Sequence, residues 1–234
     1  MQPETPMMAQ TRTASTTLAL AQNRVLRNTY WLLSLSLLPT ILGAWIGVQF
    51  GFNLFAAVHP GIAFVAFLAI AFGFFFAIEK TKHSAMGVVL LLAFTGFMGL
   101  MLAPMLGVIL GFRNGWNLIA LAFGGTAAVF AAMATIATTT KRDLSKMGKF
   151  LFIGVILLLI ASFANIFLQI PALMIALSLI AIAIFSAFMV YDVNRIVTGG
   201  ETNYITATLA LYLDIYNVFA NLLALLGITG GSSD

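Results

Sequence analysis

The sequence contains no cysteine and only two histidines among its 234 residues. Disulfide bonds and thiolate metal sites are therefore excluded, and His59 and His83 lie far apart in the sequence. Charged residues are also scarce, at 8% of the chain against about 25% in a typical soluble domain. With 62% hydrophobic residues, the chain indicates a helical protein that crosses a membrane several times.

Seven apolar windows are long enough to span a bilayer, which takes about 20 residues at 1.5 Å per residue. They cover residues 29–50, 60–78, 85–110, 116–138, 150–169, 171–194 and 204–227. The predicted fold class is an all-α membrane protein with seven transmembrane helices, in a single domain over residues 24–228. The last window carries a polar stripe, which leaves a re-entrant segment open as the alternative to a full span.

The two ends of the chain have a different composition from the seven windows. Residues 1–23 are rich in Thr, Ala, Gln and Met, and their only charged residues are Glu4 and Arg12. We expect a disordered cytoplasmic tail there, because such a segment has too little apolar surface to bury. Residues 229–234 are expected to form a short C-terminal tail.

The distribution of lysine and arginine predicts the orientation in the membrane. With the N-terminus inside, ten of the eleven basic residues face the cytoplasm, and Arg113 alone lies outside. The cytoplasmic ten are Arg12, Arg24, Arg27, Lys80, Lys82, Lys141, Arg142, Lys146, Lys149 and Arg195. Seven spans then place the C-terminus on the periplasmic side. We therefore attribute the net charge of +4 to basic residues at the cytoplasmic face of the membrane, and we expect no nucleic-acid partner.

Small residues mark where helices approach closely. Gly43, Gly47 and Gly51 repeat every four residues in the first window, and Gly96 and Gly99 stand in the third. Glycine lets membrane helices pack backbone to backbone. The pattern predicts packing within the chain, or alternatively a hinge or a regulated dimer face.

The most informative stretch is the polar stripe of the seventh window. Asp214, Asn217 and Asn221 fall on one face of a helix at this spacing. A carboxylate at mid-membrane costs about 3 kcal/mol or more if it faces lipid. We therefore expect this helix to be an inner one, surrounded by the others.

A second carboxylate, Asp192, stands near the end of the sixth window. A short turn through Gly199 and Gly200 makes the sixth and seventh helices antiparallel neighbours. Asp214 lies ten residues past Tyr204, about half way across the bilayer core. Cβ atoms lean toward the N-terminus of their own helix, so the two carboxylates lean toward each other. The sequence therefore predicts an Asp192–Asp214 pair.

Two carboxylates close together at low dielectric cannot both stay ionised cheaply, so the pair is expected to share a proton and titrate as a unit. Oxygen-only ligands suit Ca²⁺ better than a transition metal, which makes Asp192 and Asp214 a candidate for transient Ca²⁺ binding. Asn217 and Asn221 would support this site, and no other cofactor is expected. The alternative is a structural pair, with Asp214 bonded to Asn or Tyr groups and Asp192 to the turn at Arg195.

Four charged residues near the cytoplasmic face are candidate gate partners for Asp192. Glu79, Lys80 and Lys82 end the second window, and Arg195 follows Asp192 by three residues. For the first three, the alternative is a solvated interfacial loop.

No catalytic arrangement accompanies the aspartates. Asp192 and Asp214 on successive spans resemble the layout of intramembrane aspartyl proteases, but those carry Gly-x-Gly-Asp on the second helix. Here Leu211-Tyr-Leu precedes Asp214. Ser/His/Asp sets, metal-binding His pairs and phosphate-binding glycine loops are also absent from the sequence. We therefore predict that the protein is not an enzyme.

Several separate motifs carry a family resemblance. They are Val25-Leu-Arg-Asn-Thr-Tyr30, Ala164-Asn-Ile-Phe-Leu-Gln169 with Pro171, and Gly199-Gly-Glu-Thr-Asn-Tyr-Ile205 leading into Leu211-Tyr-Leu-Asp-Ile-Tyr-Asn217. With these motifs in order over residues 24–228, the sequence resembles the Bax inhibitor-1 (TMBIM) family of multi-pass membrane proteins. It is most similar to the bacterial YccA-type branch.

This resemblance implies six helices packed around a central seventh, and two roles. Family members are described as pH-sensitive Ca²⁺ leak channels with an aspartate pair as sensor, and Asp192 and Asp214 match those positions. A basic residue near the end of the second helix locks the channel members; here Thr81 stands there, between Lys80 and Lys82. The YccA-type branch is described as restraining the FtsH membrane protease.

The expected function is therefore a non-enzymatic protein of a bacterial inner membrane that modulates FtsH. The alternative is a pH-sensitive Ca²⁺ or cation leak channel gated by Asp192 and Asp214. The expected partners are the lipid bilayer and the FtsH complex, with Ca²⁺ or H⁺ as permeant or gating ions.

Overall fold

The computed structural model describes residues 6–140 and 144–230, and within them the side chains from residue 20 onward except that of Phe55. This part of the chain is helical and contains no strand. The helices are α1 (Pro6–Gln49), α2 (Leu54–Ala57), α3 (Pro60–Thr81), α4 (Ala85–Leu110), α5 (Gly115–Thr139), α6 (Met147–Leu168), α7 (Pro171–Val197) and α8 (Tyr204–Gly230).

Seven of these helices are long and apolar enough to cross a membrane, which confirms the predicted fold class. Each coincides with one predicted window, while α2 is a single added turn between the first two spans. α8 is one continuous helix of 27 residues, about 40 Å long. It therefore has the length of a full span rather than of a re-entrant segment.

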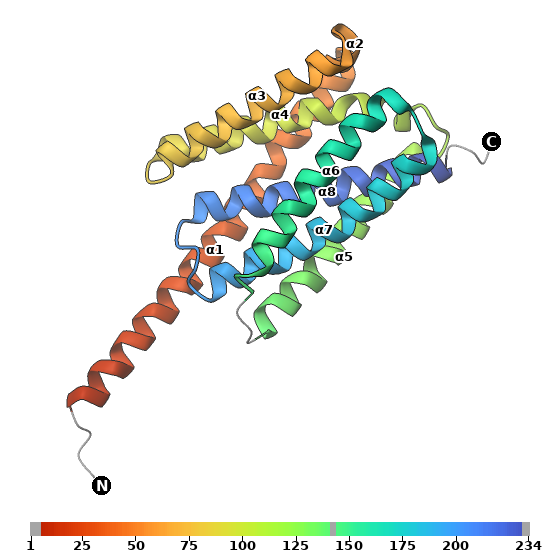
Figure 1. The fold of residues 1–234 in the computed structure, drawn as a ribbon. Coiled ribbons are helices and arrows are strands. Elements are labelled where there is room, and N and C mark those ends of the chain that lie inside the picture. The colour runs from red at the N-terminus through yellow and green to blue at the C-terminus, as the bar shows by residue number, and fades with distance from the viewer. Residues whose placement is uncertain (1–5, 141–143, 231–234) are drawn as a thin grey trace.

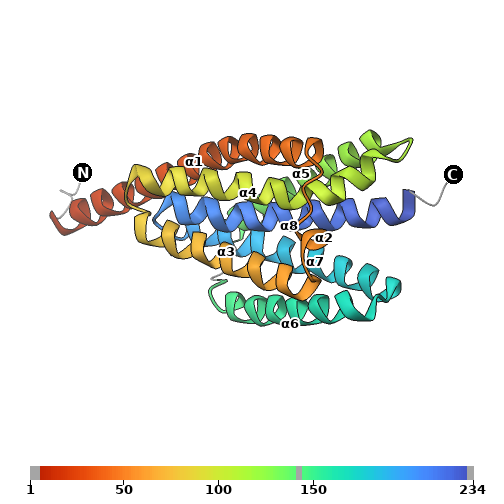
Figure 2. The same ribbon diagram turned by 90° about the horizontal axis from the view of Figure 1, so that it is seen from above.

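α8 lies inside the bundle, as its polar stripe predicts. It packs against α1, α3, α4, α5 and α7, and Figure 2 shows it between α1 and α4 on one side and α3 and α7 on the other. α6 packs mainly against α7 and has no buried residue, so it is the most peripheral of the seven spans. The α3–α4 and α7–α8 turns lie at the N-terminal end of the bundle, and the end of α8 lies at the other (Figure 2).

Part of the predicted disordered tail over residues 1–23 is described by the structure, as helix. Residues 6–23 form the beginning of α1, which extends away from the bundle (Figure 1). A helix that is already nucleated by the following span propagates at little cost, and Ala, Leu, Met and Gln favour it. Residues 1–5, residues 231–234 of the predicted C-terminal tail, and Lys141 and Arg142 of the predicted cytoplasmic set lie outside the described residues.

Four of the five predicted glycines join α1 to α4 within the chain, whereas Gly51 lies beyond the end of α1 and would place a Cβ in open space. A Cβ at Gly43 would fall on the backbone of Gly96, and one at Gly99 would overlap the carbonyl oxygen of Thr40. Gly47 likewise faces Ala103. The two helices therefore touch through their backbones, and the small residues serve intramolecular packing.

Two tyrosines tie α8 to these helices through hydroxyl groups. The Tyr212 hydroxyl lies 2.8 Å from the Thr40 hydroxyl of α1 and donates to the Thr95 carbonyl of α4 at 3.3 Å. The Tyr216 hydroxyl donates to the Met98 carbonyl of α4 at 3.1 Å. Both aromatic rings thus have a bonded polar end inside the bundle, as packing residues require.

We expect Tyr212→Phe to lower the free energy of unfolding by about 1 kcal/mol, because it removes a buried hydrogen bond and leaves its partners satisfied. The Thr40 hydroxyl keeps the Ser36 carbonyl, 2.9 Å away, as an acceptor. Denaturation in mixed micelles measures this effect. A loss above about 3 kcal/mol would contradict a packing role, because it would exceed one hydrogen bond.

Candidate functional site

The last two spans bring two carboxylates together. Asp192 lies near the end of α7 and Asp214 near the middle of α8, and α7 packs against α8 so that the two carboxylates are close enough to interact electrostatically. Both are buried, with 8% of Asp192 and 4% of Asp214 exposed. The antiparallel helices thus place the two side chains as their Cβ directions lead one to expect.

The contact between Asp192 and Asp214 has chemical consequences. Two ionised carboxylates are both acceptors, so they form a hydrogen bond only when one of them carries a proton. The Oδ2 atom of Asp214 is buried and has no hydrogen-bond donor within the described chain. A buried polar atom without a partner is costly, so this position favours a proton, a water or a cation. The role of the Asp192–Asp214 pair as a pH sensor or Ca²⁺ site stays a prediction.

Arg195 is the basic group next to the pair, at the end of α7 that is predicted to be cytoplasmic. Its Nη1 atom lies 3.6 Å from Oδ1 of Asp192, and its Nη2 atom lies 3.4 Å from Oε2 of Glu201. The guanidinium also sits over the ring of Tyr191, 5.6 Å from its centroid. The structural alternative predicted for Asp192, an interaction with the turn at Arg195, is therefore present. It exists together with the proximity of Asp192 to Asp214.

The other candidate gate partners lie apart from Asp192. Lys82 forms an ion pair with Glu79 on its own helix, and the described residues contain no ion pair from Lys80 or Lys82 to Asp192. Thr81, which stands at the position of the family's basic lock, donates its hydroxyl to the Ala77 carbonyl of its own helix. In this structure Arg195 is the basic partner of Asp192.

Asn217 and Asn221 face a cavity rather than the carboxylates. A cavity of about 680 Å³ lies mainly between α6, α7 and α8, and its polar lining residues are Ser162, Asn165, Gln169, Ser178, Asn217 and Asn221. Asn217 and Asn221 each donate their amide to the carbonyl one turn earlier, at 2.8 Å. Their Oδ1 atoms are thus left as acceptors, one and two turns beyond Asp214 on α8.

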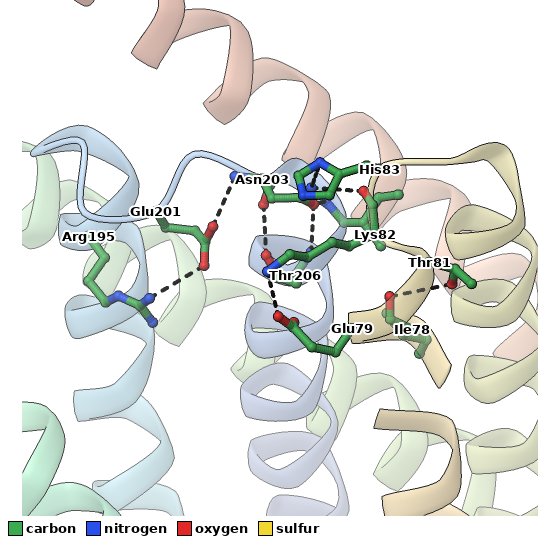
Figure 3. A network of polar contacts seen from close by, with 10 residues as sticks. Ile78, Glu79, Thr81, Lys82, His83, Arg195, Glu201, Asn203 and Thr206 are labelled. Atoms are coloured by element: carbon green, nitrogen blue, oxygen red, sulfur yellow. Dashed lines mark hydrogen bonds and ion pairs between the residues drawn. The ribbon is translucent and has the colours of Figure 1, made fainter. Parts of the chain in front are cut away.

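Sequence reasoning missed two residues in the α7–α8 turn, Glu201 and Asn203. Figure 3 shows Glu201 between Arg195 and Asn203, and Asn203 beside the end of α3. An asparagine directly before Tyr204, the first residue of α8, is a recognisable N-cap signal. The reach of its amide across to α3 has no signal in the local sequence.

Together, these features define a class: a seven-span helical membrane protein with a buried carboxylate pair on its last two spans. The family model described as inhibitor of apoptosis-promoting Bax1 matches residues 22–231. The chain belongs to this Bax inhibitor-1 family, which confirms the predicted resemblance.

Bacterial relatives cover nearly the whole chain. A Vibrio cholerae protein described as an uncharacterized membrane protein is 40% identical over 224 residues, 96% of this chain and 97% of its own. Escherichia coli K12 has a relative described as modulator of FtsH protease YccA, 39% identical over 208 residues, 89% of this chain and 91% of its own. A relative from Escherichia coli O6:H1, described as inner membrane protein YccA, has the same identity and coverage.

Proposed function

We propose that this chain is a non-enzymatic inner-membrane protein that modulates an FtsH-type membrane protease. The observation that carries the proposal is its similarity to the relative described as a modulator of FtsH protease, which extends over 89% of this chain. The match also covers 91% of that relative's own length, so the two proteins are compared as nearly whole chains.

The long first helix supports an interaction outside the bilayer. α1 has 44 residues and is about 66 Å long, whereas the hydrocarbon core is about 30 Å thick. About half of α1 therefore extends beyond the membrane, and the distribution of basic residues places that half in the cytoplasm. A projecting helix is a surface that a membrane-bound protease can contact from the same side.

We expect the full chain to co-purify with FtsH in mild detergent, and deletion of residues 1–23 to abolish the association. A variant in which a Gly/Ser segment of equal length replaces these residues separates tail length from the helix itself. If the helix carries the contact, the replacement behaves like the deletion. Absence of association between FtsH and the full chain would contradict the proposal.

A second function is favoured by the contact between Asp192 and Asp214. We propose a proton-gated cation leak in which the two carboxylates form the latch. A proton shared between them holds α7 to α8; when it leaves, two like charges repel across the contact or recruit a cation. The nearby cavity, with acceptor oxygens from Asn217 and Asn221, suits a hydrated cation on the far side of the pair.

The leak requires no bound cofactor, and Ca²⁺ is the proposed ion because only oxygen ligands are available at the pair. We expect the wild-type protein in proteoliposomes to admit Ca²⁺ at a rate that rises with pH, since the latch is closed while the proton is shared. Empty vesicles provide the baseline. A Ca²⁺ flux equal to that baseline at every pH would rule out the leak and leave the protease proposal untouched.

A further inference from the structure

One side chain completes the ends of two helices at the cytoplasmic face. Asn203 precedes the first residue of α8, and its Oδ1 atom accepts from the backbone N–H groups of Ile205 at 2.8 Å and Thr206 at 3.3 Å. Its Nδ2 atom donates to the carbonyl of Lys82, the C-cap of α3, at 2.8 Å. One amide thus satisfies orphan donors of α8 and an orphan acceptor of α3.

The same residue is connected to the carboxylate pair. The backbone N–H of Asn203 donates to Oε1 of Glu201 at 2.9 Å, and Oε2 of Glu201 accepts from Arg195, which in turn pairs with Asp192. The contacts therefore run from Asp192 to Arg195. Figure 3 shows how they continue from Arg195 through Glu201 to Asn203, and from there to the end of α3. His83, with Nδ1 3.5 Å from the Asn203 amide, borders this route at the α3–α4 turn.

α3 packs mainly on α4, and its contact with α8 is slight. Near its end, Ile78 is fully buried in the core, so apolar packing also contributes there. Lys82 forms an ion pair with Glu79 of α3, and the described residues contain no ion pair from Lys82 to α7 or α8. The hydrogen bond from Asn203 to the Lys82 carbonyl is thus a polar link from the start of α8 to the end of α3.

We propose that Asn203 is a positioning residue that holds the cytoplasmic end of α3 against the start of α8. It takes the place of a charged lock, and Glu201 fixes its backbone relative to Arg195 and Asp192. A neutral amide bonded to a carbonyl does not titrate, so this hold persists across the pH range in which the carboxylates change state.

Substitutions can separate the role of the Asn203 amide oxygen from the role of its N–H group. Asn203→Ser and Asn203→Asp keep an oxygen that caps α8 but lose the N–H donor to Lys82, whereas Asn203→Ala loses both. If Asn203 only caps α8, serine or aspartate can replace it without moving α3. If Asn203 also holds α3, neither residue can replace it, because both lack the N–H donor to Lys82.

The cysteine-free chain allows spin labels to be placed at chosen sites only. We would label Lys80→Cys on α3 and Thr198→Cys after α7, both exposed, and measure their separation by pulsed electron resonance. We expect Asn203→Ser, Asn203→Asp and Asn203→Ala all to shift the distribution to longer distances and broaden it. The pair Ile62→Cys and Met174→Cys, near the opposite ends of these helices, should be unchanged and serves as the control.

The result that overturns the proposal is a wild-type distance distribution in Asn203→Ser and Asn203→Asp with a shift in Asn203→Ala alone. That outcome would assign Asn203 to capping α8 only. The measurement does not depend on ion flux. If the proposed leak also holds, Asn203→Ser raises the basal Ca²⁺ flux at least twofold; an unchanged flux with a shifted distance would refute the leak gate and keep the positioning role.

Discussion

Replacing Gly99 with alanine is expected to destabilise the bundle by about 3 kcal/mol, although alanine is the better helix former by about 1 kcal/mol. A Cβ at this position would overlap the Thr40 carbonyl oxygen and lie 2.9 Å from the backbone nitrogen of Ala44. Both atoms belong to the backbone of α1, so no side chain can move aside. The helices must separate, which also pulls Thr40 away from the Tyr212 hydroxyl.

Gly107→Ala is the matched control, because Gly107 lies on the same helix with open space around its Cα. We expect Gly107→Ala to be neutral or slightly stabilising in the same denaturation experiment. Equal effects of the two substitutions would show that the loss comes from the helix itself and would contradict a close α1–α4 contact.

Asp214→Asn is expected to reduce Ca²⁺ flux at alkaline pH at least about tenfold and to remove its pH dependence. The size of the effect follows from the coupling of the two carboxyl groups. When two groups titrate as a unit, the interaction between them is worth more than about one pK unit, which changes a protonation equilibrium by a factor of about ten. Asparagine supplies a permanent N–H donor to Asp192, so the latch stays closed when the proton would otherwise leave. The fold should be at least as stable at alkaline pH, because the substitution removes the repulsion between two ionised carboxylates.

Tyr216→Phe removes a hydrogen-bonded hydroxyl from a partly buried residue of the same helix. It should keep the pH-dependent flux and so controls for general disturbance of α8. A flux of unchanged size and unchanged pH response in Asp214→Asn would contradict the latch. Association with FtsH measured on the same variant is expected to be normal, because the proposed contact lies on α1.

The spans and the carboxylate contact follow from short-range rules, and for that reason they could be predicted. Apolar length alone defines each crossing, and α8 begins at Tyr204 as the prediction has it. The approach of Asp192 to Asp214 needs only an antiparallel turn and the direction of Cβ atoms. The identity of the basic partner stayed open, because Arg195 and the Lys80–Lys82 segment both lie at the predicted cytoplasmic face.

Other features depend on information that local composition does not hold. The segment ahead of the first span lacks apolar surface, yet it continues α1 because the following span has already nucleated the helix. Asn203 is recognisable as an N-cap, but its bond to Lys82 depends on where α3 ends in space, 121 residues earlier in the chain. The cavity beside Asn217 and Asn221 likewise arises from the loose packing of α6.

We propose that Asp192 and Asp214 share one proton and titrate as a unit. Infrared difference spectroscopy of the carboxyl C=O stretch, recorded on wild type, Asp192→Asn and Asp214→Asn across a pH titration, tests this proposal. We expect one buried carboxylic-acid band in the wild type that disappears as pH rises, and that is lost or displaced in each single variant. A wild-type protein without such a band, or a band that survives both substitutions unchanged, would contradict it.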